Sequence, residues 1–464
     1  MSERPAFVLG VSGATWDVMG PMIAAGKLPH VERLCRSGVR GTLASVRAPG
    51  DKHFRPQTAW PSLATGCRPE HHGVTRFFHT AADLVRPTIW RLLSDTGRSV
   101  GLFGWPMTWP PSPINGFDVP CHHARDGSTW PPELAVRQAS TREVRLHAAV
   151  RGVRSLARHG ALWPLAPHLG RAARRLVVER DPLRRSLILG HLKQEAAFQL
   201  FLAFRERRRP SVSTFATFIA DWISHRYWRY HEPALFPGTD ATDARALGAA
   251  VEDAYRAVDG FLGRVVSSLP EDAVVALVSE HGMAPETTPA EIGPWQYTIN
   301  GPSLRELVGL PETVDMRPIA RWLAIRPHNG RALPADCADR IRAVCVAETG
   351  HSLFQVYEHR NEVIVKYDLG RAVNGTGSNL ERLRLRWNAR DVAFLDVAVR
   401  ANPQRSAMHA ESGVLILSGP TIRRNEEIQG ARIIDFAPTF LRAIGTEFAD
   451  VPFDGEPLDV FTRS

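Results

Sequence analysis

The stretch that decides the fold runs from residue 276 to residue 285: Ala276-Leu277-Val278-Ser279-Glu280-His281-Gly282-Met283-Ala284-Pro285. It closes an apolar run that begins at Ala273, and an apolar run bounded by turn residues is typical of a strand buried on both faces of a parallel sheet. Ligands of open α/β sheets bind just beyond the carboxyl ends of such strands. Neighbouring side chains of a regular strand point to opposite faces, so Glu280 and His281 meet at one centre only if the chain turns, which Gly282 permits. The stretch indicates a metal site at the sheet edge, with the start of a polar loop as the alternative.

The N-terminal part of the chain predicts further strands and a helix. Residues 6–11, Ala-Phe-Val-Leu-Gly-Val, predict the first strand, and residues 41–46 predict another. A loop rich in turn residues then leads to Thr58 and a helical stretch. A hydroxyl at the mouth of a sheet, followed by a helix, is a geometry found for nucleophiles. Thr58 is therefore a candidate catalytic residue, and capping of the helix is the alternative role.

Composition narrows the class of protein. With 464 residues, 44% apolar and 23% charged, the chain predicts one large α/β domain with insertions, or two domains. The five cysteines are scattered and form no CxxC pair, which favours a reducing compartment over a disulfide framework or zinc fingers. No segment approaches the roughly 20 apolar residues of a membrane span, and the first residues do not resemble a secretory signal. A cytoplasmic location is the expectation.

The net charge of +9 is concentrated in one region. Between Arg142 and Arg185 there are eleven arginines and three acids, and many of the arginines recur at helical spacing. They form either the solvated faces of amphipathic helices or a guanidinium-lined approach for an anionic substrate. The patch is not accompanied by a nucleic-acid-binding module, so nucleic acid is not the expected partner.

Several motifs occur in one order along the chain. They are Gly13-Ala14-Thr15-Trp16-Asp17, Trp60-Pro61-Ser62-Leu63-Ala64-Thr65-Gly66, Pro69-Glu70-His71-His72-Gly73, Trp105 to Pro111, Trp130 to Leu134, Ser279 to Met283, Asp435 to Thr439 and Asp454 to Leu458. Together they resemble the alkaline phosphatase superfamily, and within it the type I phosphodiesterase/nucleotide pyrophosphatase branch. The resemblance implies an α/β fold with a central, mostly parallel sheet flanked by helices and a smaller inserted subdomain. We expect the core at residues 1–294 and 375–464, an Arg-rich helical insertion at about 140–210, and a lid-like subdomain at 295–374.

The resemblance also implies two zinc ions with a Thr or Ser nucleophile between them. One ion takes Asp, His and His, and the matching residues are Asp221, His225 and His409. If residues 218–228 are helical, the spacing of four puts Asp221 and His225 on one face, so that both can point at one ion. This half of the site is complete in the sequence.

The other half departs from the family pattern. Ser12 stands where the pattern has an Asp at the end of the first strand, and Glu280 replaces an Asp before His281. Glu can bind zinc, but its extra methylene shifts the ion, and a neutral Ser is a poor ligand. The nucleophile position of the pattern falls on Pro56, two residues before Thr58. Asp51 and His53, in the preceding loop, are candidates for substitute ligands.

The predicted function is metal-dependent phosphoryl hydrolysis or transfer, by a phosphodiesterase acting on a small phosphate-containing substrate through Thr58. We expect one bound zinc ion and leave a second open. The alternatives are a degenerate member that binds an anionic ligand without catalysis, and a one-metal enzyme whose second half-site serves a different group transfer.

Overall fold

The computed structural model describes residues 4–134, 146–287, 297–319, 322–327, 332–372, 380–388, 390–400 and 405–463. These residues form two compact units. Unit 1 comprises Met1–Thr287 and Ser406–Ser464, and unit 2 comprises Thr288–Arg405. The sequence places an insertion at 295–374, and both of those boundaries lie outside the described residues.

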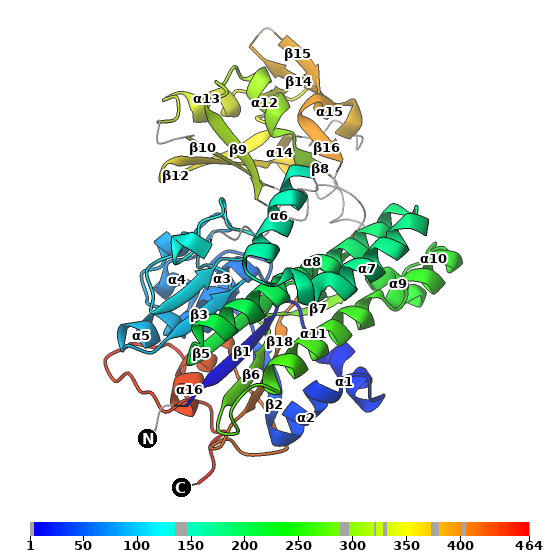
Figure 1. The fold of residues 1–464 in the computed structure, drawn as a ribbon. Coiled ribbons are helices and arrows are strands. Elements are labelled where there is room, and N and C mark those ends of the chain that lie inside the picture. The colour runs from blue at the N-terminus through cyan, green and yellow to red at the C-terminus, as the bar shows by residue number, and fades with distance from the viewer. Residues whose placement is uncertain are drawn as a thin grey trace. The chain divides into compact units, whose positions relative to one another are not determined.

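Unit 1 is built on an eight-stranded sheet with the order β19-β2-β18-β6-β1-β5-β3-β4 (Figure 1). The strands are β1 (Ala6–Val11), β2 (Gly38–Ala44), β3 (Val100–Phe103), β4 (Gly116–Val119), β5 (Val212–Thr217), β6 (Val274–Val278), β18 (Ser412–Ser418) and β19 (Glu426–Ile428). Every neighbouring pair is parallel except the two pairs that β18 makes with β2 and β6. The expected α/β class, with a mostly parallel central sheet, is confirmed.

Helices cover both faces of this sheet because its central strands are apolar on both sides. Phe7 and Leu9 of β1 pack into one core with α1 (Trp16–Ala24), α2 (Pro29–Ser37), α8 (Pro182–Arg208), α9 (Ile219–His231) and α11 (Ala250–Val266). Ala6 and Val8 face the other core, which contains α3 (Pro56–Thr65), α5 (Ile89–Asp95) and α16 (Phe436–Ala443). The alternation of side chains along β1 therefore fixes which helices lie on which side.

The Arg-rich region expected at about 140–210 is helical from the point where it is described. It forms α6 (Leu146–Arg158), α7 (Leu162–Val178) and α8, and residues 135–145 lie outside the description. The phenylalanines of α8, such as Phe198 and Phe201, are fully buried under the sheet, and α7 packs on α8. The short helices α4 (Pro69–His72) and α10 (Ala241–Leu247) complete the α-helices of unit 1 within the described ranges.

Unit 2 has its own core and small antiparallel sheets. Its strands are β8 (Tyr297–Ile299), β9 (Val314–Ile319), β10 (Trp322–Pro327), β11 (Cys345–Val346), β12 (Phe354–His359), β13 (Glu362–Tyr367), β14 (Arg384–Trp387), β15 (Arg390–Ala393) and β16 (Ala398–Arg400). Its helices are α12 (Gly301–Leu307), α13 (Cys337–Arg342), α14 (Leu369–Ala372) and α15 (Phe394–Val397). β12 and β13 form a hairpin in which His359 faces Glu362.

Among the described residues, no helix is both long enough and apolar enough to cross a membrane.

Candidate metal centre

The carboxyl ends of three adjacent strands bring the candidate residues together. β1 lies between β5 and β6, with Val11 opposite Thr217 and Gly10 opposite Val278. Ser12 follows β1, the turn into α9 follows β5, and Glu280 follows β6. These three segments follow the carboxyl ends of their strands and lie at one edge of the sheet, which is where an open α/β sheet binds its ligands.

A glycine allows two of these segments to approach closely. Gly13 has a φ of +74°, and a Cβ atom there would lie 2.9 Å from the Cα atom of Asp221. The backbone N–H of Asp221 donates to the carbonyl of Ser12 at 3.1 Å. Only glycine fits this position without displacing α9.

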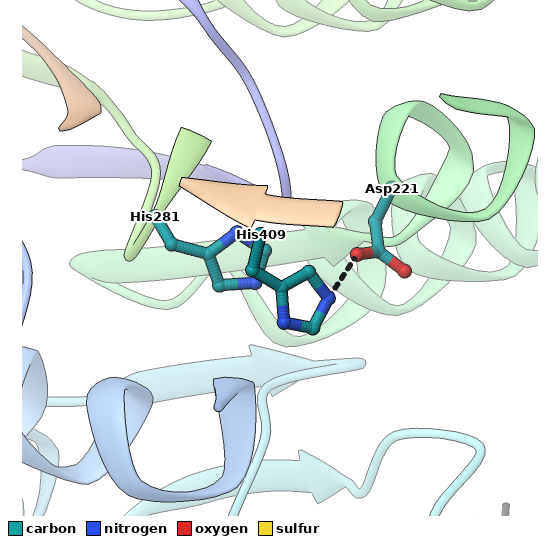
Figure 2. Close-up of side chains that lie close together, drawn as sticks. All are labelled: Asp221, His281 and His409. Carbon is teal, nitrogen blue, oxygen red and sulfur yellow. Dashed lines mark hydrogen bonds and ion pairs between the residues drawn. The ribbon is translucent and has the colours of Figure 1, made fainter. Parts of the chain in front are cut away.

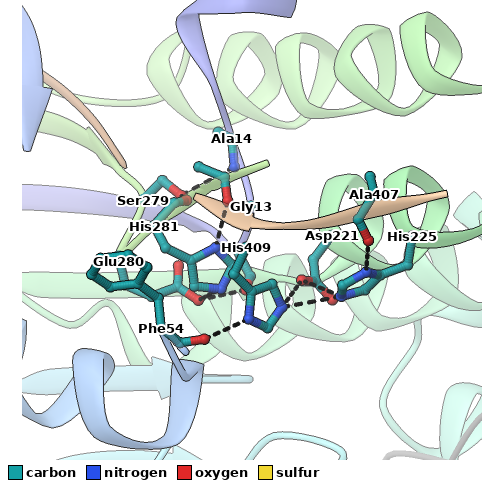
Figure 3. A network of polar contacts seen from close by, with 12 residues as sticks. Gly13, Ala14, Phe54, Asp221, His225, Ser279, Glu280, His281, Ala407 and His409 are labelled. Atoms are coloured by element: carbon teal, nitrogen blue, oxygen red, sulfur yellow. Dashed lines mark hydrogen bonds and ion pairs between the residues drawn. The ribbon is translucent and has the colours of Figure 1, made fainter. Parts of the chain in front are cut away.

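Helix α9 presents Asp221 and His225 to the same point. Nε2 of His225 lies 3.4 Å from Oδ1 of Asp221, as the spacing of four residues predicts for one helix face. His409 reaches the same point from β17 (Ala407–Ala410), which pairs antiparallel with β7 (Gly282–Pro285). Its Nε2 atom lies 3.1 Å from Oδ1 of Asp221 and 3.0 Å from Nε2 of His225 (Figure 3).

The three ligand atoms have the separation that a zinc ion requires. Tetrahedral zinc bonds of about 2.0–2.1 Å place neighbouring ligand atoms about 3.3 Å apart, and the observed separations are 3.0, 3.1 and 3.4 Å. His281 lies close by, with its ring stacked on that of His409 at a centroid distance of 4.0 Å. The ligand atoms of Asp221, His281 and His409 all lie within 4.8 Å of one another (Figure 2).

Backbone carbonyls orient all three imidazoles. The Nδ1 atom of His225 contacts the carbonyl of Ala407 at 2.6 Å, that of His409 contacts Phe54 at 2.7 Å, and that of His281 contacts Gly282 at 2.9 Å. A carbonyl can only accept, so each Nδ1 carries the proton and each Nε2 of a neutral ring presents a lone pair. Metal-binding histidines are typically held in this way.

The charge state of the cluster favours a cation. Burial lowers the pKa of His409 to about 3, with repulsion from His281 adding to the effect, so the ring is neutral at pH 7. Burial alone would raise the pKa of Asp221, but the imidazoles of His225 and His409 outweigh it and hold that pKa well below its usual range. An ionised carboxylate therefore lies beside two imidazole Nε2 atoms that are 3.0 Å apart. One carboxylate and two imidazoles form a donor set that fits a metal ion.

The second half of the site contains a buried hydrogen bond instead of two Asp carboxylates. The Ser12 hydroxyl donates to Oε1 of Glu280 at 2.6 Å, and both side chains are fully buried. Oε1 also lies 3.1 Å from Nε2 of His281. Burial works against a charge on His281, but attraction to Glu280 outweighs it and raises the pKa of His281. Oε2 of Glu280 has no hydrogen-bond partner in the described part of the chain, whereas Nε2 of His281 faces the other oxygen of the same carboxylate.

A family comparison agrees with this geometry. The family model described as type I phosphodiesterase / nucleotide pyrophosphatase matches residues 6–357. The chain belongs to this family. It is therefore a member of the alkaline phosphatase superfamily, as the sequence motifs indicate. No curated protein matches the chain.

The family's metal dependence makes the position of the candidate nucleophile important. Thr58 lies in the first turn of α3, is 1% exposed, and donates its hydroxyl to the carbonyl of Arg55 at 3.1 Å. The helix begins at Pro56, and its N-cap, Arg55, makes no capping hydrogen bond through its side chain. Among the described contacts, none links Thr58 to the metal cluster. Asp51, a candidate substitute ligand, forms an ion pair with Arg55.

The structure adds two residues that the sequence did not single out. His122 and His123 follow β4, their rings lie 4.1 Å apart, and the ring of His122 packs edge-on against Phe218 at 4.6 Å. Burial lowers the pKa of His123 to about 4 and holds that of His122 well below its usual value, while the nearby Asp221 charge opposes both shifts. No ring nitrogen of this pair has a hydrogen-bond partner in the ranges that the structure describes. The sequence did contain a signal for this pair: two adjacent histidines follow a strand, and candidate ligands follow other strands of the same sheet.

Proposed function

We propose that this member of the family is a metal-dependent phosphodiester hydrolase that works with one tightly bound ion, held by Asp221, His225 and His409. The observation that carries the proposal is the mutual spacing of their three ligand atoms. Two imidazoles and one carboxylate favour zinc over magnesium or calcium, which prefer oxygen ligands. A metal ion held there would stabilise negative charge on a phosphoryl group of the substrate.

The protein itself contributes orientation and hydrogen bonding. The carbonyls of Ala407 and Phe54 hold the two imidazoles so that Nε2 faces Asp221. His122 and His123 are the proposed contacts for the substrate's phosphoryl oxygens, because their unpartnered ring nitrogens lie close enough for the Asp221 charge to act on them. A hydrogen bond from a ring N–H to a phosphoryl oxygen becomes stronger as negative charge develops on that oxygen.

The attacking group is proposed to be water. The family's nucleophile position is Pro56, which has no hydroxyl, and the Thr58 hydroxyl is buried and bonded within its own helix. Attack by Thr58, as expected from the sequence, would require that bond to break and a path for the substrate to open. Thr58 is retained as the second candidate because it is the hydroxyl nearest in sequence to the family position.

Substitution of Thr58 by Val, which keeps the shape of the side chain, distinguishes the two candidates. The matched control is Thr65→Val, since Thr65 lies in the same helix, is equally buried, and donates to Pro61 at 2.7 Å. Attack by water predicts that both variants retain turnover of a phosphodiester to within about threefold. Loss of turnover in Thr58→Val alone, together with loss of an acid-stable phosphoryl-enzyme that is trapped in the parent, would assign the nucleophile to Thr58 instead.

A non-catalytic role is the second candidate function, and the Ser12–Glu280 hydrogen bond favours it. That bond occupies the half-site where a second metal would complete the clamp on the attacking and leaving oxygens. The hypothesis of a non-catalytic role predicts that the zinc-loaded protein binds a phosphodiester without turnover. The non-catalytic role would be excluded if the parent protein turned over the phosphodiester, kept this activity after repurification, and lost it in His409→Ala.

A further inference from the structure

Helix α7 has an apolar face turned to solvent as well as one turned to the protein. Its inner face is anchored by Leu165 and Ala172, which are buried. On the outer face Trp163 is 87% exposed, Val177 is 82% exposed and Val178 is 77% exposed. At 100° per residue these three side chains fall within about 100° of one another around the helix. Trp163 lies at one end of this face and the two valines lie at the other, about 21 Å away along the helix axis. Large exposed apolar side chains on one helix face are characteristic of an interaction surface.

α7 and the residues that flank it carry exposed positive charge. α7 contains no acidic residue. Exposed arginines lie on α7, at the end of α6 and just after α7, namely Arg154, Arg158, Arg171, Arg174, Arg175 and Arg180. Within the described residues, none of the six forms an ion pair with an acid. Arg171 donates to Nδ1 of His168 at 3.2 Å. The acids at the end of α7 are otherwise engaged: Glu179 accepts the backbone N–H of Asp181, and Asp181 caps α8.

We propose that the outer face of α7 is a docking surface for an anionic lipid bilayer, on which the protein lies without spanning it. Exposed Trp and Val beside unpaired arginines are the composition of a helix that rests in the membrane interface. Trp prefers the headgroup level, and each arginine gains energy from the negative surface potential of anionic lipids. This inference does not depend on the proposed catalytic function.

Two other occupants fit the surface less well. A second copy, docked face to face, would place unpaired arginines against unpaired arginines, and that repulsion opposes a symmetric dimer. A nucleic acid would satisfy the arginines, but it would leave Val177 and Val178 in contact with a charged, hydrated backbone. A bilayer satisfies both features of the surface.

The test uses the full chain and flotation with two kinds of vesicle, one of phosphatidylcholine alone and one with phosphatidylglycerol added. We expect binding to the anionic vesicles that weakens as salt increases. Replacing Arg171, Arg174 and Arg175 by Gln should weaken that binding about 100-fold, since each charge near the surface contributes a factor of about five. Trp163→Ala should weaken it about tenfold or more, because its apolar surface no longer enters the interface.

The matched control changes the same number of charges elsewhere. Replacing the exposed residues Arg382, Arg384 and Arg390 by Gln should alter vesicle binding by less than about threefold. Brominated lipid should quench part of the tryptophan emission of the parent, and Trp163→Phe should bind vesicles but lose that quenching. Turnover of a water-soluble phosphodiester should be the same in the α7 variants as in the parent.

The proposal is overturned if the parent does not bind phosphatidylglycerol vesicles at low salt, or if both arginine triples weaken binding equally. It is also overturned if a single-stranded oligonucleotide binds in a Trp163-dependent way while vesicles do not. A fall in soluble-substrate turnover with unchanged vesicle binding would reassign the arginines to guidance of the substrate.

Discussion

The Ser12–Glu280 hydrogen bond can be tested by removing one hydroxyl. Ser12→Ala removes the hydroxyl donor from Oε1 of Glu280 in a fully buried position and leaves Nε2 of His281, at 3.1 Å, as the neighbour of that oxygen. The matched control is Ser224→Ala, because Ser224 is also fully buried but its hydroxyl has no partner in the described structure. The two substitutions remove the same atom from equally buried positions and differ only in whether a hydrogen bond is lost.

The expected magnitude follows from the charge of the acceptor. A hydrogen bond to a charged group contributes about 1.5–3 kcal/mol. Ser12→Ala should therefore lower the free energy of unfolding by about 2 kcal/mol, a factor of about thirty in the folding equilibrium. Ser224→Ala should be neutral or slightly stabilising, because it removes a buried polar group that has no partner.

The assay is urea unfolding of the metal-free protein, followed by fluorescence of the buried tryptophans of unit 1, which include Trp60 and Trp90. Metal-free conditions keep any bound ion from masking the loss. If Ser12→Ala and Ser224→Ala agree to within about 0.5 kcal/mol, the hydrogen bond does not stabilise this half-site and the account of it is wrong.

Three further predictions concern the same unit. Ser12→Asp combined with Glu280→Asp should raise the occupancy of a second metal, measured as metal per chain, because the restored pair supplies two short carboxylates. The effects of the two single changes should not add, since both residues would contact one ion. His123→Ala should lower kcat/KM for a phosphodiester about tenfold or more without changing metal content, and an equal loss of metal would contradict its assignment to the substrate. Burial lowers the pKa of His72 to about 4 from 6.5, and its Nδ1 accepts the Val74 N–H. Its stabilising contribution, at most about 3 kcal/mol, is therefore complete above pH 6.5 and lost as the pH falls toward 4, so His72→Gln should flatten the decrease in stability with pH over that window.

The sequence predicted the sheet, and the shared helix face of Asp221 and His225, because the signals for both are local. The apolar runs at 6–11 and 273–278 correspond to β1 and β6, and the spacing of Asp221 and His225 placed both on one helix face. The antiparallel pairing of β17 with β7, which brings His409 to that face, is a contact across many residues and came only from family resemblance.

The parts that were not predicted depend on contacts between distant residues. Ser12 and Glu280 each looked like the loss of a ligand, whereas the structure pairs them across 268 residues in one buried hydrogen bond. The orientation of Thr58 was not readable from the sequence, since Thr58 lies in the first turn of α3 and its hydroxyl turns back to the carbonyl of Arg55. His122 and His123 follow β4, which lies in the same sheet as β5, and β5 leads to Asp221. Their place near the site depends on this strand order.

The central claim is that Asp221, His225 and His409 hold one metal ion. The most direct measurement is the metal content of the purified protein by plasma mass spectrometry, for the parent, for His225→Ala, and for His351→Ala as an exposed control in unit 2. The account predicts about one zinc ion per chain in the parent and in the control, and little or none in His225→Ala, which loses one of three protein ligands. The same zinc content in His225→Ala as in the parent would contradict it.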